Sequence, residues 1–327
     1  MAGSTQPRAL LRVDSLTVAF STPRGVIYPA RQISFRVGDH ETLGLVGESG
    51  SGKSVTLRAI LGLIVPPGRV VGGQVLLDGV DLVTASRQEL QAIRGSQIAM
   101  IFQDPMASLN PVLTVGDQLS ETLRYKAGLN GRAAMERAEA MLERVGIRPA
   151  KARLRSYAHQ LSGGMAQRVM IALAIAGNPK LLLADEPTTA LDVSVQDQVL
   201  SLLEELRLET GMGMIIVSHD LGVIARSCDR VAVMYAGSLL EQGTVDEVLR
   251  SPRHPYTRML LATIPSLQPN ADRSPLPSIA GQLPDLATLR GGCPFAARCA
   301  YRRDACDDIP VVLDAPDDAH GSACPFV

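Results

Sequence analysis

The residues with the clearest chemical signature form a glycine-rich segment near the N-terminus. Eight residues match the pattern G-x-x-x-x-G-K-[ST], with a strand-like stretch before them and a helix-like stretch after them. Glycines let the backbone wrap closely around phosphate, and the following helix offers its positive N-terminal end. In such a loop Lys53 reaches the β- and γ-phosphates and Ser54 ligates Mg²⁺. The predicted phosphate site consists of Gly47, Glu48, Ser49, Gly50, Ser51, Gly52, Lys53 and Ser54.

A second feature is a pair of carboxylates at the end of an apolar stretch. The residues LLLADE predict a buried strand that ends at Asp185 and Glu186. We expect Asp185 to bind Mg²⁺ through its shell and Glu186 to polarise an attacking water as general base. A solvated acidic pair at a strand end is the plainer alternative.

A third feature is the segment LSGGMAQRV, residues 161–169, in which a serine and two glycines open a helix. A helix N-terminus is a favourable anion site. This one lies too far from Lys53 in the sequence to be part of the same loop. The pattern therefore suggests that two chains share each nucleotide, one supplying the glycine-rich loop and the other the LSGG segment.

Strands and helices must position these segments. Short apolar stretches such as Thr42–Val46 predict buried strands, and the amphipathic stretch 194–211 predicts a helix. Met135 recurs with other apolar residues at helical spacing over 132–146. Buried strands that alternate with helices predict a mainly parallel sheet covered by helices. The strand-rich first hundred residues predict an additional antiparallel layer, and the stretch at about 104–165 predicts a helical insertion.

The composition excludes several classes of protein. The 327 residues are 46% hydrophobic and 20% charged, with 32 basic and 33 acidic residues and a net charge of −1. This balance argues against disorder and provides no positive field for nucleic acid. No apolar run approaches the roughly 18 residues of a membrane-spanning helix. The first residues also lack the apolar core of a signal peptide. The default compartment is therefore the cytosol.

Cysteine is concentrated in the last 35 residues, which hold four of the five cysteines. A reducing cytosol disfavours disulfides. Four thiolates could instead close a site for zinc or for an iron–sulfur cluster, and unliganded thiols are the third alternative. The remaining Cys228 is interpreted as a small buried hydrophobe. The four candidate ligands are Cys293, Cys299, Cys306 and Cys324.

The five histidines divide by their neighbourhoods in the sequence. His320 lies close to the last cysteine and is a weak alternative ligand. We interpret His40, His159 and His254 as surface or loop residues. His219 follows the apolar stretch GMIIVS.

In their order, these motifs resemble those of the ATP-binding subunit of an ABC transporter, over about residues 10–250. The matching segments are GESGSGKS, IFQDP with Gln103, LSGGM, LLLADEPTTALD and IIVSHD with His219. The resemblance implies an α/β P-loop ABC ATPase. Its RecA-like parallel-sheet core would carry an antiparallel β subdomain, the helical insertion, and a small C-terminal extension rich in proline and cysteine. It also implies hydrolysis of ATP with Mg²⁺.

The same resemblance implies roles for further residues. Gln103 would sense Mg²⁺ and the γ-phosphate, and His219 would contact the γ-phosphate and hold the catalytic geometry, beside the base Glu186. An aromatic ring from the early β region would stack on adenine. Phe20 fits that role best, with core packing as its alternative role, and Tyr28 is the runner-up. The Mg²⁺ shell would involve Ser54, Gln103 and Asp185. The dimer seam would include Leu161, Ser162, Gly163, Gly164 and Asp192.

The C-terminal part points to one branch of the family. The segments SPRHPYTRMLLATIPSL and IAGQLPDLATLRGGCPFAARCAYRRDAC resemble the extension of oligopeptide, dipeptide and nickel importers. We place the ATPase domain at residues 8–255 and the extension at 256–327. Members of this branch with this cysteine pattern resemble cluster binders, so the resemblance favours a [4Fe–4S] cluster over zinc. A bound metal would add folding energy to a segment that is poor in apolar residues.

The resemblance implies a subunit that powers import of peptides or related small solutes at the cytoplasmic face of a bacterial inner membrane. The implied partners are a second, related ATP-binding subunit, two transmembrane permease subunits and an extracytoplasmic solute-binding protein, without nucleic acid. One alternative is the same fold serving another solute such as nickel. Others are a soluble ABC ATPase of DNA repair or translation, and a redox sensor whose cluster gates the ATPase. The transported solute lies beyond what the sequence specifies, as does the choice between a homodimer and a heterodimer.

Overall fold

The structure is a computed structural model, and it describes residues 9–189, 191–263, 279–289, 291–313 and 319–326. The described residues fall into two compact units. The first unit is built from the described residues of 85–216, with 38–41 and 9–10. The second unit is built from residues 11–37 and 42–84, together with the chain from Val217 onward.

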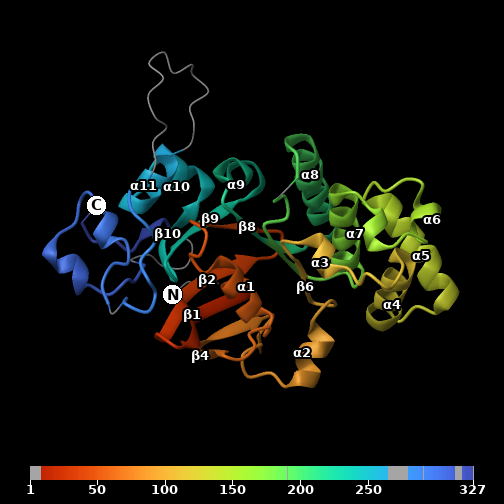
Figure 1. Cartoon of the computed structure of the whole chain (residues 1–327), viewed down its shortest axis with the longest axis horizontal. Helices are drawn as coiled ribbons and strands as arrows, with labels where there is room; N and C mark the ends of the chain where they lie inside the picture. The colour runs from red at the N-terminus through yellow and green to blue at the C-terminus, as the bar shows by residue number, and fades with distance from the viewer. Residues whose placement is uncertain (1–8, 190, 264–278, 290, 314–318, 327) are drawn as a thin grey trace, which may run out of the picture. The chain divides into compact units, whose positions relative to one another are not determined.

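The second unit contains an antiparallel sheet in the strand order β2-β1-β4-β5. Leu11 in β1 pairs with Leu77 in β4, and Phe20 pairs with Gly68. The strands lie side by side in red and orange in Figure 1. The additional antiparallel layer predicted from the sequence is therefore present. Its strands are β1 (Ala9–Thr22), β2 (Gly25–Gly38), β4 (Gly68–Leu77) and β5 (Val80–Asp81).

The second unit also contains the strand order β11-β10-β9-β3. Strand β3 runs parallel to β9, whereas β10 runs antiparallel to β9 and to β11. These strands are β3 (Thr42–Val46), β9 (Arg230–Tyr235), β10 (Ser238–Thr244) and β11 (Gly321–Ser322). The α-helices of this unit are α1 (Lys53–Ile60), α9 (Leu221–Ser227), α10 (Val245–Arg250) and α11 (Pro255–Ala262). Two 3₁₀ turns follow, η2 (Ala296–Arg298) and η3 (Asp304–Asp307).

The first unit contains the strand order β8-β7-β6, with β6 parallel to β7. All five residues of β7 are buried, as predicted for an apolar strand between helices. The strands are β6 (Ile98–Ile101), β7 (Leu181–Asp185) and β8 (Gly213–Ser218).

Helices make up most of the first unit, and α4 to α7 gather in the yellow and green part of Figure 1. Helices α4 to α6 lie within the stretch of about 104–165 that the sequence predicts as a helical insertion, and α7 begins at the end of that stretch. The helices are α2 (Arg87–Ile93), α3 (Pro105–Ser108), α4 (Val115–Ala127), α5 (Gly131–Arg144), α6 (Ala150–Arg153), η1 (Ala158–Gln160), α7 (Gly163–Ile175) and α8 (Val193–Thr210).

Local sequence explains where these helices begin and end. Helix α4 begins with a capping box, in which the Thr114 hydroxyl accepts from the Asp117 N–H and the Asp117 carboxylate accepts from the Thr114 N–H. Helix α8 ends at Thr210, and the following Gly211 caps it in a left-handed conformation. In α5, Met135 is 39% exposed, so its place on the apolar face was predicted wrongly. The buried residues of α5 are Ala134, Ala138, Met141 and Leu142.

The predicted α/β class is confirmed, with parallel and antiparallel strand pairs. The domain division remains a prediction, because residues 264–278 of the linker lie outside the described residues. Within the described part of the chain, no helix is both long and apolar enough to cross a bilayer.

Candidate active site

The glycine-rich loop follows the buried strand β3 and leads into α1, as the sequence predicts. Gly47 and Gly52 have φ angles of 150° and 105°. A Cβ atom at Gly47 would lie 2.0 Å from the Met234 carbonyl oxygen, and one at Gly52 would lie 1.8 Å from the Pro29 carbonyl oxygen. Both positions therefore require glycine, because these two carbonyl oxygens leave no room for a Cβ atom.

Lys53 lies inside this loop. Its ammonium group donates to the carbonyl oxygens of Gly47 and Glu48 at 2.8 and 2.9 Å, and to the Ser51 hydroxyl at 3.3 Å. The residue is only 5% exposed. Ser54, in the first turn of α1, is half-buried. The loop thus holds a buried positive charge, and the contact of Lys53 with phosphates stays a prediction.

The acidic pair lies at the end of β7 in the first unit. Asp185 is buried, and Glu186 follows in a left-handed conformation with a φ of 48°. The Gln103 amide donates to Oε2 of Glu186 at 3.0 Å, and the Thr189 hydroxyl donates to the same oxygen at 2.8 Å. The structure therefore brings two residues of the predicted catalytic set, Gln103 and Glu186, into direct contact. Thr189 is a partner that sequence reasoning missed.

The LSGG segment opens helix α7, and the Ser162 hydroxyl caps it by accepting from the Met165 N–H at 3.4 Å. The cap of α8 is Asp192, whose carboxylate accepts from the Val195 N–H at 3.0 Å. Both capping residues line one cleft of about 460 Å³ in the first unit. Two helix N-termini and two arginines face this cleft, which suits an anion. Its predicted lining residues are Ser162, Gly163, Gly164 and Asp192, and its arginines are Arg148 and Arg168. Leu161 precedes the cap and is half-buried.

Three further residues were predicted to contact the nucleotide, namely His219, Phe20 and Tyr28. His219 directly follows β8 and is exposed. Phe20 is half-buried opposite Gly68, and its ring would lie 2.6 Å from a Cβ atom there. Tyr28 is half-buried, with the Arg31 guanidinium 5.5 Å from its ring centre. Stacking on adenine therefore stays a prediction for both aromatic residues.

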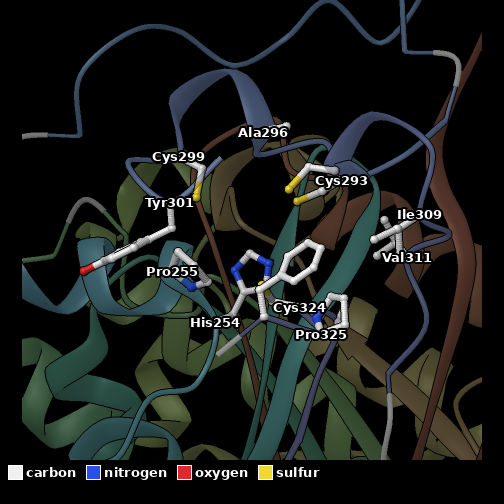
Figure 2. Close-up of a pocket in the computed structure, with 13 residues that line it drawn as sticks. His254, Pro255, Cys293, Ala296, Cys299, Tyr301, Ile309, Val311, Cys324 and Pro325 are labelled. Atoms are coloured by element: carbon white, nitrogen blue, oxygen red, sulfur yellow. The ribbon is translucent and has the colours of Figure 1, made fainter. Parts of the chain in front are cut away.

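The four C-terminal cysteines line one small cavity of about 20 Å³ in the second unit. In Figure 2 the thiols of Cys293 and Cys299 point toward the imidazole ring of His254. Burial raises the pKa of Cys293 to about 11, and the other three thiols of the cavity also raise it. All five cysteines of the chain are free thiols. The four cysteines that lie close together in the sequence therefore also lie close together in the structure.

The donor chemistry of this cavity fits a four-thiolate metal centre. Nε2 of His254 is also buried with no hydrogen-bond partner in the described part of the chain, and its ring lines the cavity. The cavity has room for about one water molecule, and no three His, Cys, Asp or Glu side chains among the described residues are arranged to hold a metal ion. The predicted cluster therefore remains a prediction.

The structure changes the interpretation of two histidines, although His254 does lie in a loop, as one of its two predicted settings. His254 is 1% exposed rather than a surface residue, and its Nδ1 caps α11 by accepting from the Tyr256 N–H at 3.0 Å. His320, considered as an alternative ligand, is not among the residues that line the cysteine cavity. Its Nε2 instead lies 2.7 Å from Oε1 of the buried Glu241.

A glycine-rich loop with a buried lysine, an oriented acidic residue at a strand end and a cleft lined by two helix N-termini are features of ATPases of the P-loop class. Residues 30–189 match the ABC transporter family, and residues 240–306 match the oligopeptide/dipeptide transporter C-terminal region. The chain belongs to the ABC transporter family, and it is an ATPase whose ligands are ATP and Mg²⁺.

Individual relatives resemble the chain over most of its length. It is 49% identical over 293 residues to the oligopeptide transport ATP-binding protein OppD of Bacillus subtilis, covering 89% of this chain and 82% of OppD. It is 46% identical over 316 residues to the dipeptide transport ATP-binding protein DppD of Bacillus subtilis, covering 96% and 94%. Among solved structures, a dimeric post-hydrolysis state of the ATP-binding cassette MJ0796 bound to ADP and Pi aligns with a TM-score of 0.65 at 28% identity. That alignment covers 72% of this chain and 98% of MJ0796.

Proposed function

We propose that this chain is the ATP-hydrolysing subunit of a bacterial peptide importer, bound peripherally to the cytoplasmic face of the inner membrane. The observation that carries the proposal is the match of residues 240–306 to the oligopeptide/dipeptide transporter C-terminal region, in a chain that also matches the ABC transporter family. The names of the relatives OppD and DppD support the same solute class. The ATPase domain would comprise residues 8–255 and the extension 256–327.

In this proposal Glu186 is the general base. The two donors on its Oε2, from Gln103 and Thr189, support the role because they orient the carboxylate before water arrives. Asp185, with Ser54 and Gln103, would hold Mg²⁺, and Lys53 with the loop N–H groups would bind the phosphates. His219 would contact the γ-phosphate, and Phe20 would stack on adenine, with Tyr28 as its alternative.

The second anion-binding cleft supports a shared nucleotide site. The LSGG residues and Asp192 would contact the ATP that is bound by the loop of a second, related ATP-binding subunit. Nucleotide binding would thus close two subunits on each other, and hydrolysis would release them. The helical insertion at about 104–165 would transmit this motion to two transmembrane permease subunits. A solute-binding protein outside the membrane would deliver the peptide.

Co-purification tests the importer against the soluble alternatives. The full-length chain, tagged and expressed at native level, is captured from a detergent extract of membranes. The proposal predicts that two membrane permeases and a related ATP-binding protein are recovered with it. Recovery with ribosomes or DNA, and without permeases, would instead identify a soluble ABC ATPase.

Uptake of a labelled dipeptide, a labelled oligopeptide and nickel then identifies the solute class. The proposal predicts that peptide uptake is lost in cells that carry only Glu186→Gln and is retained with Glu209→Gln. Glu209 is a suitable control because its carboxylate lies on the surface, is 60% exposed and pairs with Arg144. Loss of nickel uptake with unchanged peptide uptake would favour the nickel importer and contradict peptide import.

We further infer that the extension holds a metal centre on Cys293, Cys299, Cys306 and Cys324, with a [4Fe–4S] cluster favoured over zinc. The cavity that all four thiols share supports this inference. When bound, such a group would cross-link the extension and contribute to its folding free energy.

Metal analysis tests the inferred centre. After anaerobic purification, the inference predicts stoichiometric iron and sulfide, with visible absorption that is lost in Cys306→Ser and kept in Cys228→Ser. Cys228 is the matched control, because it lies outside the extension and forms no disulfide. A colourless protein with stoichiometric zinc would reject the cluster, and a metal-free protein would reject the centre itself.

A further inference from the structure

Glu48 is the second residue of the glycine-rich loop, and its N–H, its carbonyl oxygen and its carboxylate each form hydrogen bonds. Its carbonyl oxygen accepts from the Lys53 ammonium at 2.9 Å. Its N–H donates to the Tyr256 hydroxyl at 3.0 Å, and its two carboxylate oxygens each accept from Nη1 of Arg298 at 3.0 Å. The first contact belongs to the loop itself, whereas Tyr256 and Arg298 are respectively 208 and 250 residues away in the sequence.

The Arg298 side chain is built into this position. It is only 7% exposed, whereas the Glu48 side chain is 24% exposed. Its Nε and Nη2 donate to the carbonyl oxygens of Ala280 and Ile279 at 2.8 and 3.1 Å, and its Nη1 also donates to the Tyr235 hydroxyl at 3.1 Å. Each guanidinium nitrogen therefore has an acceptor, which fixes the orientation of the group. A buried, fully hydrogen-bonded ion pair differs in this from an exposed one, which contributes little.

Arg298 and Tyr256 are also connected to the cysteine cavity. Arg298 directly precedes Cys299, and Phe295 lies between Cys293 and Cys299 in the sequence. The Phe295 ring is fully buried and lies 5.3 Å from the ring of Tyr256 and 5.3 Å from that of Tyr235. The segment that carries the cysteines therefore includes Arg298 itself and packs against Tyr256 through the Phe295 ring.

We propose that the C-terminal extension positions the phosphate loop, with Arg298 and Tyr256 as positioning residues that hold Glu48 and thereby set the affinity for ATP. The Tyr256 hydroxyl holds the Glu48 backbone, and Arg298 neutralises its carboxylate beside the place where the anionic phosphates bind. Neither residue needs to touch the nucleotide. The proposal rests on ATP binding by this chain and is independent of which metal the cysteines bind.

The charge of Glu48 determines whether each substitution weakens or restores the affinity for ATP. Without Arg298, Glu48 keeps a partly buried negative charge in the loop, and this charge repels the phosphates of ATP. Removal of the Glu48 carboxylate in the same chain removes that repulsion. A loss of affinity caused only by a loosened extension would not be rescued in this way. The double variant therefore separates positioning of Glu48 from a general structural role.

The experiment is calorimetric titration of the full-length chain with ATP and Mg²⁺. We expect Arg298→Gln to raise the dissociation constant about tenfold, which corresponds to ~1.4 kcal/mol. In the double variant Arg298→Gln with Glu48→Gln, the constant should return to within about threefold of the wild-type value, because the two effects are not additive. Arg302→Gln is the matched control, since Arg302 pairs with Asp307 in the same segment but is 52% exposed. Its constant should stay within about twofold of the wild-type value.

Three outcomes would overturn the proposal. They are an unchanged dissociation constant in folded Arg298→Gln, an equal loss of affinity in Arg302→Gln, and a double variant that binds ATP as weakly as Arg298→Gln alone.

If Arg298→Gln does not fold, Tyr256→Phe replaces it, because this change removes only the hydroxyl that accepts from the Glu48 N–H. We expect that variant to bind ATP about threefold more weakly, as for loss of one hydrogen bond, and wild-type affinity would overturn the proposal. Failure of the wild-type chain itself to bind ATP would contradict the proposed function instead.

Discussion

Substitution of the buried Glu241 by alanine should increase the population of an open state in which strand β11 has separated from β10. Glu241 lies in β10 and is fully buried. Its Oε1 accepts from the Arg253 N–H at 2.7 Å, and its Oε2 accepts from the His254 N–H at 2.9 Å. His320, just before β11, places Nε2 2.7 Å from Oε1. One carboxylate thus joins β10, the start of α11 and the C-terminal segment.

The size of the effect follows from these three contacts. Glu241→Ala leaves two backbone N–H groups and one imidazole without their acceptor. A buried polar group without a partner costs about 1–3 kcal/mol, so the local loss should be at least about 3 kcal/mol. A loss of that size increases the population of the open state roughly 100-fold. Glu241→Gln should lose less, because its amide oxygen can still accept from one of the donors.

Hydrogen exchange at the Ala323 amide measures this opening. Ala323 donates to the Leu240 carbonyl oxygen at 2.8 Å, so its amide exchanges when the C-terminal segment leaves β10. Gln242→Ala is the matched control. Gln242 is the next residue of β10 and is buried, but its side-chain oxygen has no partner within the described part of the chain. Equal exchange rates in Glu241→Ala and Gln242→Ala would refute the reasoning.

Two further predictions concern the nucleotide site. Gly52→Ala should weaken ATP binding more than about tenfold in calorimetric titration, because the Cβ atom would meet the Pro29 carbonyl oxygen at 1.8 Å with the backbone already at a φ of 105°. Gly72→Ala has open space and should bind ATP as the wild type does, so equal binding by both variants would contradict the steric argument. Gln103→Ala should lower kcat for ATP roughly 10- to 100-fold, because it removes the amide that orients Glu186. An unchanged kcat in steady-state assays would count against that role.

Residues in compact motifs could be predicted from the sequence, because their chemistry is local. Gly47, Glu48 and Ser51, three acceptors of Lys53, lie within the loop around it, so these contacts depend on a few consecutive residues. The contact between Gln103 and Glu186 joins residues 83 positions apart, and only the family resemblance put both in one site. The parallel pairing of β3 with β9 agrees with the mainly parallel sheet that alternating apolar stretches and helices predict, whereas the strand β6 was not predicted.

Contacts between distant parts of the second unit could not be predicted in the same way. Nothing in the spacing of Glu48 and Arg298 indicates that they form an ion pair, because their contact depends on where the extension packs. His254 was predicted as a surface or loop residue, because prolines flank it in a turn-like segment. Its ring is nevertheless buried, with its centre 6.2 Å from that of Phe295. The sequence likewise did not indicate that His320 binds Glu241 rather than lining the cysteine cavity.

The central claim is that this chain hydrolyses ATP with Glu186 as its general base. The most direct test measures ATP turnover and ATP binding side by side in the wild-type chain and in Glu186→Gln. Loss of a general base should reduce kcat by roughly 10²- to 10⁴-fold, while ATP binding persists and holds two ATP-binding subunits together. Wild-type turnover by Glu186→Gln would contradict the account.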